Sequence, residues 1–209
     1  MEQVVAPALA LIADHAGWAT AVVFVTAFGE SFVFLCFLFP GTSMLIAAGA
    51  LISAGSLPYL PVLTAAVAGL VLGDAAAFWI GRRFGGAVGR LWPFSRNPDL
   101  LPAGVRFFER HGGKSVFICR FFGPIRAVIP LAAGIMLLAA GRFWIANIAS
   151  AVIWAPILLA AGDLGGTLGT RLLGRGNFLV LVVAGVLLIG IAGLGVLIYK
   201  LRRQSRPLG

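Results

Sequence analysis

The chain has 209 residues, of which 60% are apolar and only 11% carry a formal charge, and its mean hydropathy is +1.03. A soluble domain carries about 25% charged residues, so this chain cannot cover a water-soluble globule with polar side chains. Intrinsic disorder is excluded as well, because it requires many charges and few apolar residues. The composition therefore predicts an integral membrane protein.

The net charge of +9 comes from sixteen basic residues against seven acidic ones. Most of the excess lies in two blocks beside apolar segments, which are residues 82–114, called the basic loop below, and the tail after Tyr199. Such blocks are typical of the cytoplasmic flanks of membrane helices. We therefore expect no nucleic acid among the partners.

Apolar segments, taken in chain order, predict about four complete membrane helices. Residues 1–17 are expected to form an N-terminal interfacial segment, and residues 201–209 a basic cytoplasmic tail. A helix that crosses the bilayer needs about 20 predominantly apolar residues. The predicted spans lie near residues 18–35, 59–80, 143–161 and 178–199.

Two further apolar segments are interrupted where a membrane helix should continue. The first break contains Pro40, Gly41 and Thr42, and the second contains Gly123 and Pro124. Proline lacks the N–H that a helix interior needs and glycine has a permissive backbone, so the two together end a helix. We therefore expect each segment to be a re-entrant hairpin, which dips into the membrane and returns to the same side.

The two interrupted segments share an order of residue types that indicates an internal repeat. The Val-Phe-x-Cys sequence that ends at Cys36 recurs at Cys119, and the Ala-Gly that ends at Gly49 recurs at Gly134. The fold class is therefore predicted to be all-α and polytopic, with an inverted repeat and two opposed re-entrant hairpins in one membrane domain over residues 18–200. The first repeat covers about residues 30–84, the second about 115–166, and the final helix is 178–199.

The distribution of basic residues predicts the orientation. Loops rich in lysine and arginine stay on the cytoplasmic side, which fits the basic loop and the C-terminal tail. With four spans and two re-entrant segments, the N-terminus, the basic loop and the C-terminus fall on this same side. Arg171 and Arg175 then lie outside as an exception. The expected location is the bacterial inner membrane, crossed several times, with both termini cytoplasmic.

Four ionisable residues lie at membrane depth in this interpretation: Glu30, Asp74, Arg120 and Arg126. Charged groups near the centre of a membrane helix cost at least about 2.5 kcal/mol each and mark functional sites by default. On a structural interpretation, the carboxylates pair with the arginines and hold the halves together. On a functional one, Glu30 and Asp74 respond to protons and both arginines bind a lipid phosphate, which the guanidinium fork matches. Both interpretations apply if the ion pairs separate when the substrate binds.

The sequence contains no phosphate-binding loop and no His-Glu-x-x-His, Cys-x-x-Cys or Gly-x-Ser-x-Gly motif. His15 and His111 are expected to be interfacial side chains rather than metal ligands, and Cys36 and Cys119 small buried residues. We therefore expect a protein that is not an enzyme and holds no cofactor or metal.

This order of motifs resembles the DedA family, the bacterial branch of the SNARE-associated Golgi, or VTT-domain, membrane proteins. Glu30 with residues 39–51 is similar to the family's first signature, and residues 120–134 are similar to the second. Gly73-Asp74 lies in the helix between them. The resemblance covers roughly residues 20–200.

The resemblance implies a lipid transporter or scramblase. Bacterial members are associated with moving undecaprenyl phosphate or phospholipids between leaflets, often coupled to the proton motive force. The implied partners are a membrane lipid with an anionic head group and protons, and a homo-oligomer is left open. A proton- or ion-coupled transporter of a small solute, a membrane assembly factor and a membrane enzyme are the alternatives. Many relatives have an acidic residue where this chain has Thr42, so Glu30, alone or with Asp74, would have to carry the coupling.

Overall fold

The computed structural model describes residues 16–36, 41–90, 94–95, 98–121 and 126–174, and this part of the chain is all-helical, without a strand. The predicted fold class is confirmed to that extent. Three short 3-10 helices are η1 (Gly85–Arg90), η2 (Gly112–Lys114) and η3 (Cys119–Phe121). The α-helices are α2 (Ala16–Ser31), α3 (Gly41–Ser53), α4 (Tyr59–Phe84), α5 (Leu100–His111), α6 (Ser115–Ile118), α7 (Val128–Ile135) and α8 (Ala140–Leu173).

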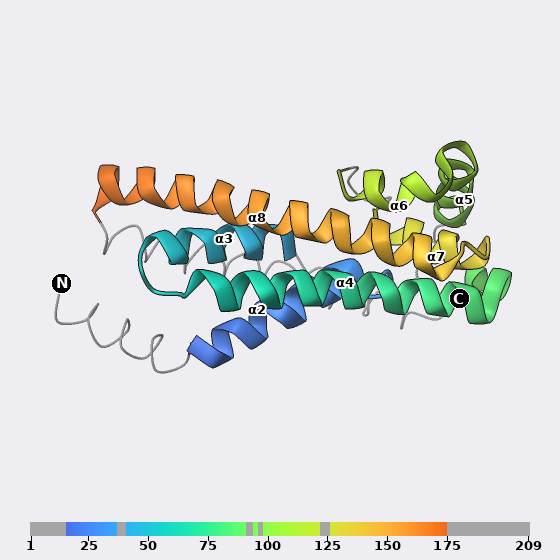
Figure 1. The fold of residues 1–209 in the computed structure, drawn as a ribbon, viewed down its shortest axis with the longest axis horizontal. Helices are drawn as coiled ribbons and strands as arrows, with labels where there is room; N and C mark the ends of the chain where they lie inside the picture. Colours follow the sequence, from blue (N-terminus) through green and yellow to red (C-terminus); the bar gives the residue numbers. More distant parts are fainter. Residues whose placement is uncertain (1–15, 37–40, 91–93, 96–97, 122–125, 175–209) are drawn as a thin grey trace, which may run out of the picture.

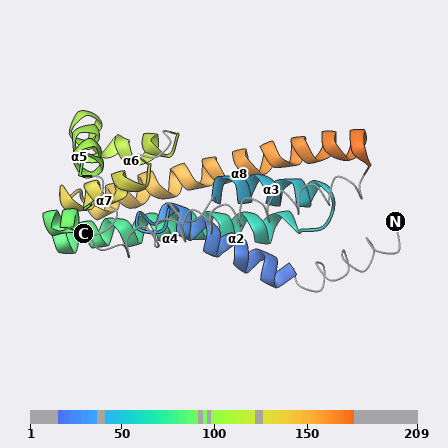
Figure 2. The same cartoon turned by 180° about the vertical axis from the view of Figure 1, so that it is seen from behind.

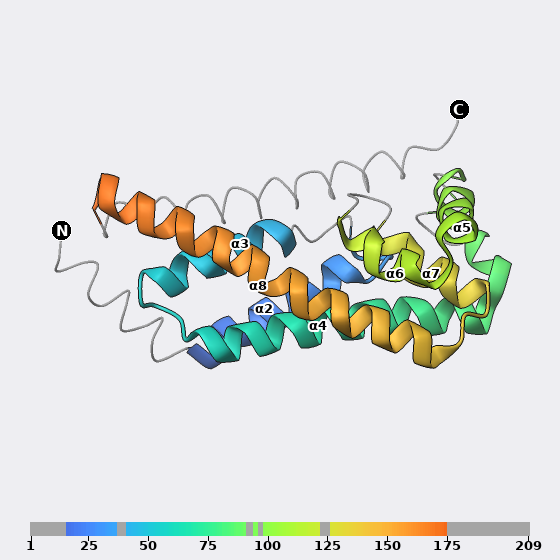
Figure 3. The same ribbon diagram turned by 45° about the horizontal axis from the view of Figure 1, so that its top comes forward.

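The two long helices, α4 and α8, run antiparallel and cross near their middle (Figure 3). Among the described residues, Tyr59–Arg90 and Ala140–Leu172 are long and apolar enough to cross a membrane, and they contain the predicted spans 59–80 and 143–161. Helix α4 begins after extended Pro58 and ends at Gly85, whose φ of +53° suits glycine and whose N–H bonds the Gly81 carbonyl oxygen. The predicted span 178–199 and the tail 201–209 lie outside the described residues.

Helix α2 corrects the prediction that residues 18–35 form a complete span. It has 16 residues, or about 24 Å of helix, which is less than the bilayer core of about 30 Å. It runs parallel to α4, because Gly69 lies against Phe24 and Gly73, one turn later, lies against Phe28. The chain turns after Ser31, and α3 returns toward the end from which α2 came (Figures 1 and 2).

The parallel direction of α2 and α4 changes the predicted topology. Counting the predicted spans placed the start of the first span and the basic loop on the same side of the membrane. That count assumed that residues 18–35 cross the membrane completely. In the structure α2 begins toward the end of the molecule where α4 also begins, opposite the end where α4 meets the basic loop (Figure 1). Both chain termini lie outside the described residues, so the side on which they lie stays a prediction.

Two short helices each pack against the long helix of the other half of the chain: α3 packs against α8, and α7 packs against α4. Glycines make this close approach, because a β-carbon at any of four positions would overlap a backbone carbonyl oxygen of the facing helix. The pairs are Gly49 with Leu159, Gly162 with Ile46, Gly134 with Phe78, and Gly81 with Leu131.

The substitution Gly162→Ala is expected to destabilise the protein, because the new methyl group meets the α3 backbone rather than a movable side chain. Overpacking of this kind costs about 1–3 kcal/mol or more. Gly165→Ala on the same helix is the matched control, since nothing lies within 4 Å of its added β-carbon and alanine favours helix by about 1 kcal/mol. Thermal unfolding of the purified protein in detergent should show a lower midpoint for Gly162→Ala alone. Equal midpoints for the two variants would show that α3 and α8 do not pack this closely.

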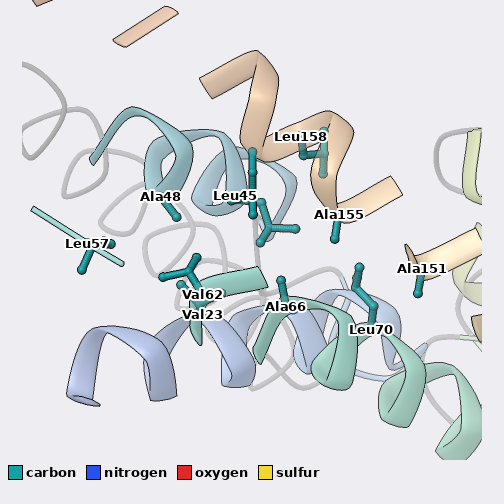
Figure 4. Close-up of a cluster of buried hydrophobic side chains, with 12 residues drawn as sticks. Val23, Leu45, Ala48, Leu57, Val62, Ala66, Leu70, Ala151, Ala155 and Leu158 are labelled. Atoms are coloured by element: carbon teal, nitrogen blue, oxygen red, sulfur yellow. The ribbon is translucent and has the colours of Figure 1, made fainter. Parts of the chain in front are cut away.

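Small and branched apolar side chains fill the space between these helices. Figure 4 shows Leu45 and Ala48 of α3, with Leu158 of α8, facing Val62 and Ala66 of α4. The outer faces are also apolar, and Ile145, Leu164 and Leu172 of α8 are each more than 70% exposed. Exposed apolar surface of this extent is typical of a face that contacts lipid.

Candidate functional site

The four predicted ionisable residues meet as two ion pairs at the level where α4 and α8 cross. Asp74 of α4 pairs with Arg120 of η3. Glu30, near the end of α2, pairs with Arg126, whose Nη2 lies 3.3 Å from Glu30 Oε2. The pairing expected on the structural interpretation is therefore present, with one carboxylate for each arginine. Each pair joins an element of the first half to an element of the second.

The Arg120 guanidinium is buried and held from three sides. Its Nη2 contacts Asp74 Oδ2 and also donates to Asn147 Oδ1 at 3.0 Å, and its Nε donates to Ser150 Oγ at 3.0 Å. Arg120 is 4% exposed and Asp74 7% exposed. Hydrogen bonds to charged groups are each worth about 1.5–3 kcal/mol. This cation is therefore fixed firmly between the two long helices.

Asn147 and Ser150 of α8 are functional candidates that the sequence reasoning missed. Both are fully buried, and Asn147 Nδ2 donates to the Val71 carbonyl oxygen of α4 at 3.0 Å. Ser150 Oγ donates to the carbonyl oxygen of Asn147 at 2.9 Å. Their spacing of three residues puts them on one face of an apolar helix. This spacing was the available signal, since polar residues at membrane depth need partners.

The second ion pair lies where the end of α2 meets the start of α3. Thr42, in the first turn of α3, donates its hydroxyl hydrogen to Glu30 Oε1. Gly41 lies directly under this carboxylate, and a β-carbon there would overlap Glu30 Oε2. Gly41 and Thr42 of the predicted break therefore hold Glu30, whereas Pro40, Gly123 and Pro124 lie outside the described residues.

The Glu30–Arg126 pair has polar atoms without hydrogen bonds. Glu30 Oε2 and Arg126 Nη2 are both buried, and neither has a hydrogen-bond partner among the described residues, although they face each other at ion-pair distance. The Ser31 hydroxyl is also buried without a hydrogen-bond partner among the described residues, and the Ser31 β-carbon lies against Gly73 of α4. Buried polar groups are nearly always paired, so the Glu30–Arg126 pair holds unused hydrogen-bonding capacity.

The four charged side chains of the site form a buried centre whose formal charges balance. Two carboxylates face two guanidinium groups. Within the described part of the chain, no group of three or more His, Cys, Asp or Glu side chains could hold a metal ion. The chemistry that these residues offer is recognition of an anion by arginine and uptake of a proton by a carboxylate.

Comparison with known proteins adds a family match. A model of the VTT domain matches residues 39–164. The chain is similar to Protein DedA of Escherichia coli strain K12, with 30% identity over 191 residues that cover 85% of this chain and 84% of that protein. An uncharacterized membrane protein of Mycobacterium tuberculosis is 32% identical over 175 residues, which cover 81% and 78% of the two chains.

Inner membrane protein YabI of Escherichia coli strain K12 is 32% identical over 145 residues, which cover 69% of this chain. The match spans 57% of YabI, so this chain corresponds to little more than half of that relative. No solved structure matches the chain. The names of these relatives support a location in a membrane, as the composition predicts.

Proposed function

The chain belongs to the VTT-domain membrane proteins of the DedA family, and on that premise we propose that it is a transporter that moves a phosphate-bearing lipid between the two leaflets. Undecaprenyl phosphate and phospholipids are the candidate substrates. The protein acts in the bacterial inner membrane, without a cofactor and without catalysing a covalent reaction.

The observation that carries the proposal is the incompletely bonded Glu30–Arg126 pair. Arg126 Nη2 is buried without a hydrogen bond among the described residues, and a guanidinium binds phosphate through two parallel N–H donors. A lipid phosphate that displaces Glu30 would satisfy these donors and keep the charge of Arg126 balanced. The sequence also predicts that Arg120 binds the phosphate, but three buried side chains already accept from Arg120, so the proposal rests on Arg126.

An inverted repeat would give such a site access to both leaflets. The glycine contacts support this part of the proposal, because the contacts between α3 and α8 have counterparts between α7 and α4. Gly134 follows Gly49 by the same number of residues as Leu131 follows Ile46, so these contact residues of α3 and α7 occupy equivalent positions in the two repeats. The two hairpins are re-entrant and opposed in this proposal, and described residues at or beside their breaks, Thr42 in the first and Arg120 and Arg126 in the second, take part in the central ion pairs or contact them. Binding at such a repeat interface near the midplane is common in membrane transporters.

Glu30 is the principal proton-responsive group in this proposal, and Asp74 supports it. A proton on Glu30 removes the charge that holds Arg126, so protonation and release of the arginine are coupled. Thr42 cannot replace the carboxylate, but its hydroxyl orients Glu30. A transporter of small solutes would use the same charged residues. The liposome experiment below distinguishes it from a lipid transporter.

Reconstitution into liposomes with a panel of labelled lipids, with and without a pH gradient, tests the function. We expect at least one phosphate-bearing lipid to change leaflet faster than in protein-free liposomes, and the gradient to alter its rate. Uptake of a small solute without movement of any lipid would favour the alternative. If neither moves, transport itself would be the wrong class of function.

The predicted orientation is tested with one single cysteine at the start of α4 and another in the basic loop, directly before α5. Cys36 and Cys119 are first replaced by alanine, and Asp99→Cys and Tyr59→Cys are then compared, since both positions are exposed. Labelling of intact cells with a membrane-impermeant maleimide is expected at position 59 and not at position 99, because the basic loop is cytoplasmic. The reverse pattern would invert the orientation.

A further inference from the structure

The two arginines of the site differ in how firmly they are held. Arg120 donates from Nε and Nη2 to side chains of both long helices and is 4% exposed. Arg126 has one carboxylate partner among the described residues, and its Nη2 makes no hydrogen bond there. Moving Arg120 would break its contacts with three buried side chains, those of Asp74, Asn147 and Ser150. Moving Arg126 would break its contact with Glu30 alone among the described residues.

Asn147 connects the elements that hold Arg120. Its Oδ1 accepts from Arg120 Nη2, and its Nδ2 donates to the Val71 carbonyl oxygen of α4, both at 3.0 Å. The carbonyl acceptor at Val71 fixes which end of the amide is nitrogen. One turn along α8, Ser150 accepts from Arg120 Nε and donates back to the Asn147 carbonyl oxygen. Asn147 and Ser150 therefore present two acceptors at the spacing of the guanidinium donors.

We propose that Asn147 and Ser150 are positioning residues that lock Arg120 onto Asp74, so that Arg120 is a fixed counter-charge between α4 and α8. Arg126 is then the arginine that leaves its carboxylate and contacts the lipid phosphate. The role of Arg126 rests on the proposed function, whereas the locking of Arg120 does not depend on it. The substrate then contacts only the side of the site that holds Glu30 and Arg126. The contacts of Arg120 with α4 and α8 stay intact during transport.

The geometry offers a direct test, because Arg120 Nη2 contacts Asp74 and Asn147 at the same time. The carboxylate can therefore be moved from α4 to α8 with the double substitution Asp74→Asn/Asn147→Asp. Asp74→Asn alone leaves a buried guanidinium without a counter-charge, and Asn147→Asp alone places two carboxylates around one guanidinium. The double variant restores one carboxylate for one arginine.

The unfolding midpoint in detergent compares the two single variants with the double variant and needs no transport assay. Each single substitution is expected to lower the midpoint by about 5 °C or more. The double variant is expected to recover part of that loss, because Asn147→Asp restores the counter-charge of Arg120 but cannot donate to the Val71 carbonyl oxygen. If Asp74→Asn does not accumulate as folded protein, recovery of folded protein in the double variant is the corresponding result. A double variant as unstable as the sum of the single variants would overturn the locking of Arg120.

Transport measurements separate positioning from lipid contact. Arg126→Lys is expected to raise the lipid density needed for half-maximal transport by about tenfold, whereas Ser150→Ala should keep the wild-type value within about twofold. If Ser150→Ala raises this density as Arg126→Lys does, Arg120 binds the lipid and the division of roles is wrong. If the wild-type protein moves no lipid, the proposed function fails while the thermal cycle still decides the role of Asn147.

Discussion

Arg126→Lys is expected to reduce lipid transport by about tenfold to a hundredfold, because lysine keeps the positive charge but loses the planar fork that binds phosphate through two hydrogen bonds. The Arg126 side chain is 13% exposed and lies 3.3 Å from Glu30, so the lysine ammonium can still pair with that carboxylate. The unfolding midpoint should therefore fall much less than the transport rate. The measurement is the rate of labelled-lipid movement in liposomes, at matched protein incorporation.

Arg106→Lys is the matched control for this substitution. Arg106 is exposed on α5, outside the central site, so the same chemical change there should leave the rate unaltered. If Arg126→Lys moved lipid at the wild-type rate, two-point recognition of phosphate by Arg126 would be wrong. A variant that lost transport and folding together would assign Arg126 a structural role.

Glu30→Gln is expected to abolish the dependence of transport on the pH gradient. Glutamine resembles the protonated acid: it can still accept from the Thr42 hydroxyl, but it no longer balances Arg126. Lipid should still bind, because the arginine is then free for phosphate. The absence of a counter-charge for buried Arg126 should also lower stability by about 3–5 kcal/mol, so the transport assay belongs well below the unfolding midpoint.

The test for Glu30 is lipid movement across a series of external pH values, with Glu109→Gln as control. Glu109 is an exposed carboxylate of α5, and its substitution should keep the wild-type curve. A wild-type curve that is flat with pH, or an unchanged curve for Glu30→Gln, would remove Glu30 from the coupling. The ion pair with Arg126 would then be purely structural.

The charged part of the site could be predicted from the sequence because charges are rare at membrane depth. Glu30, Asp74, Arg120 and Arg126 stand out in apolar surroundings, and the structure brings all four together. Which carboxylate meets which arginine could not be predicted, since it depends on α2 running parallel to α4. Asn147 and Ser150 were missed because uncharged polar residues in apolar helices are common and their partners lie far along the chain.

The helix boundaries were harder to predict for two physical reasons. Residues 18–35 contain no proline and no formal charge apart from Glu30, so the sequence does not show that the helix ends at Ser31. The helix that contains the predicted span 143–161 continues to Leu173, which the sequence did not indicate. Gly162 and Gly166 in this stretch are packing residues against α3 rather than helix breakers.

The central claim is that the site recognises a lipid by its phosphate. The most direct measurement compares two lipids in the same liposomes, with identical acyl chains and fluorescent label, of which one carries a phosphate and the other ends in a neutral hydroxyl. Wild-type protein is expected to move the phosphate-bearing lipid at least about tenfold faster, and Arg126→Lys should reduce that preference. Equal rates for the two lipids with wild-type protein, or a preference that survives Arg126→Lys unchanged, would contradict the claim.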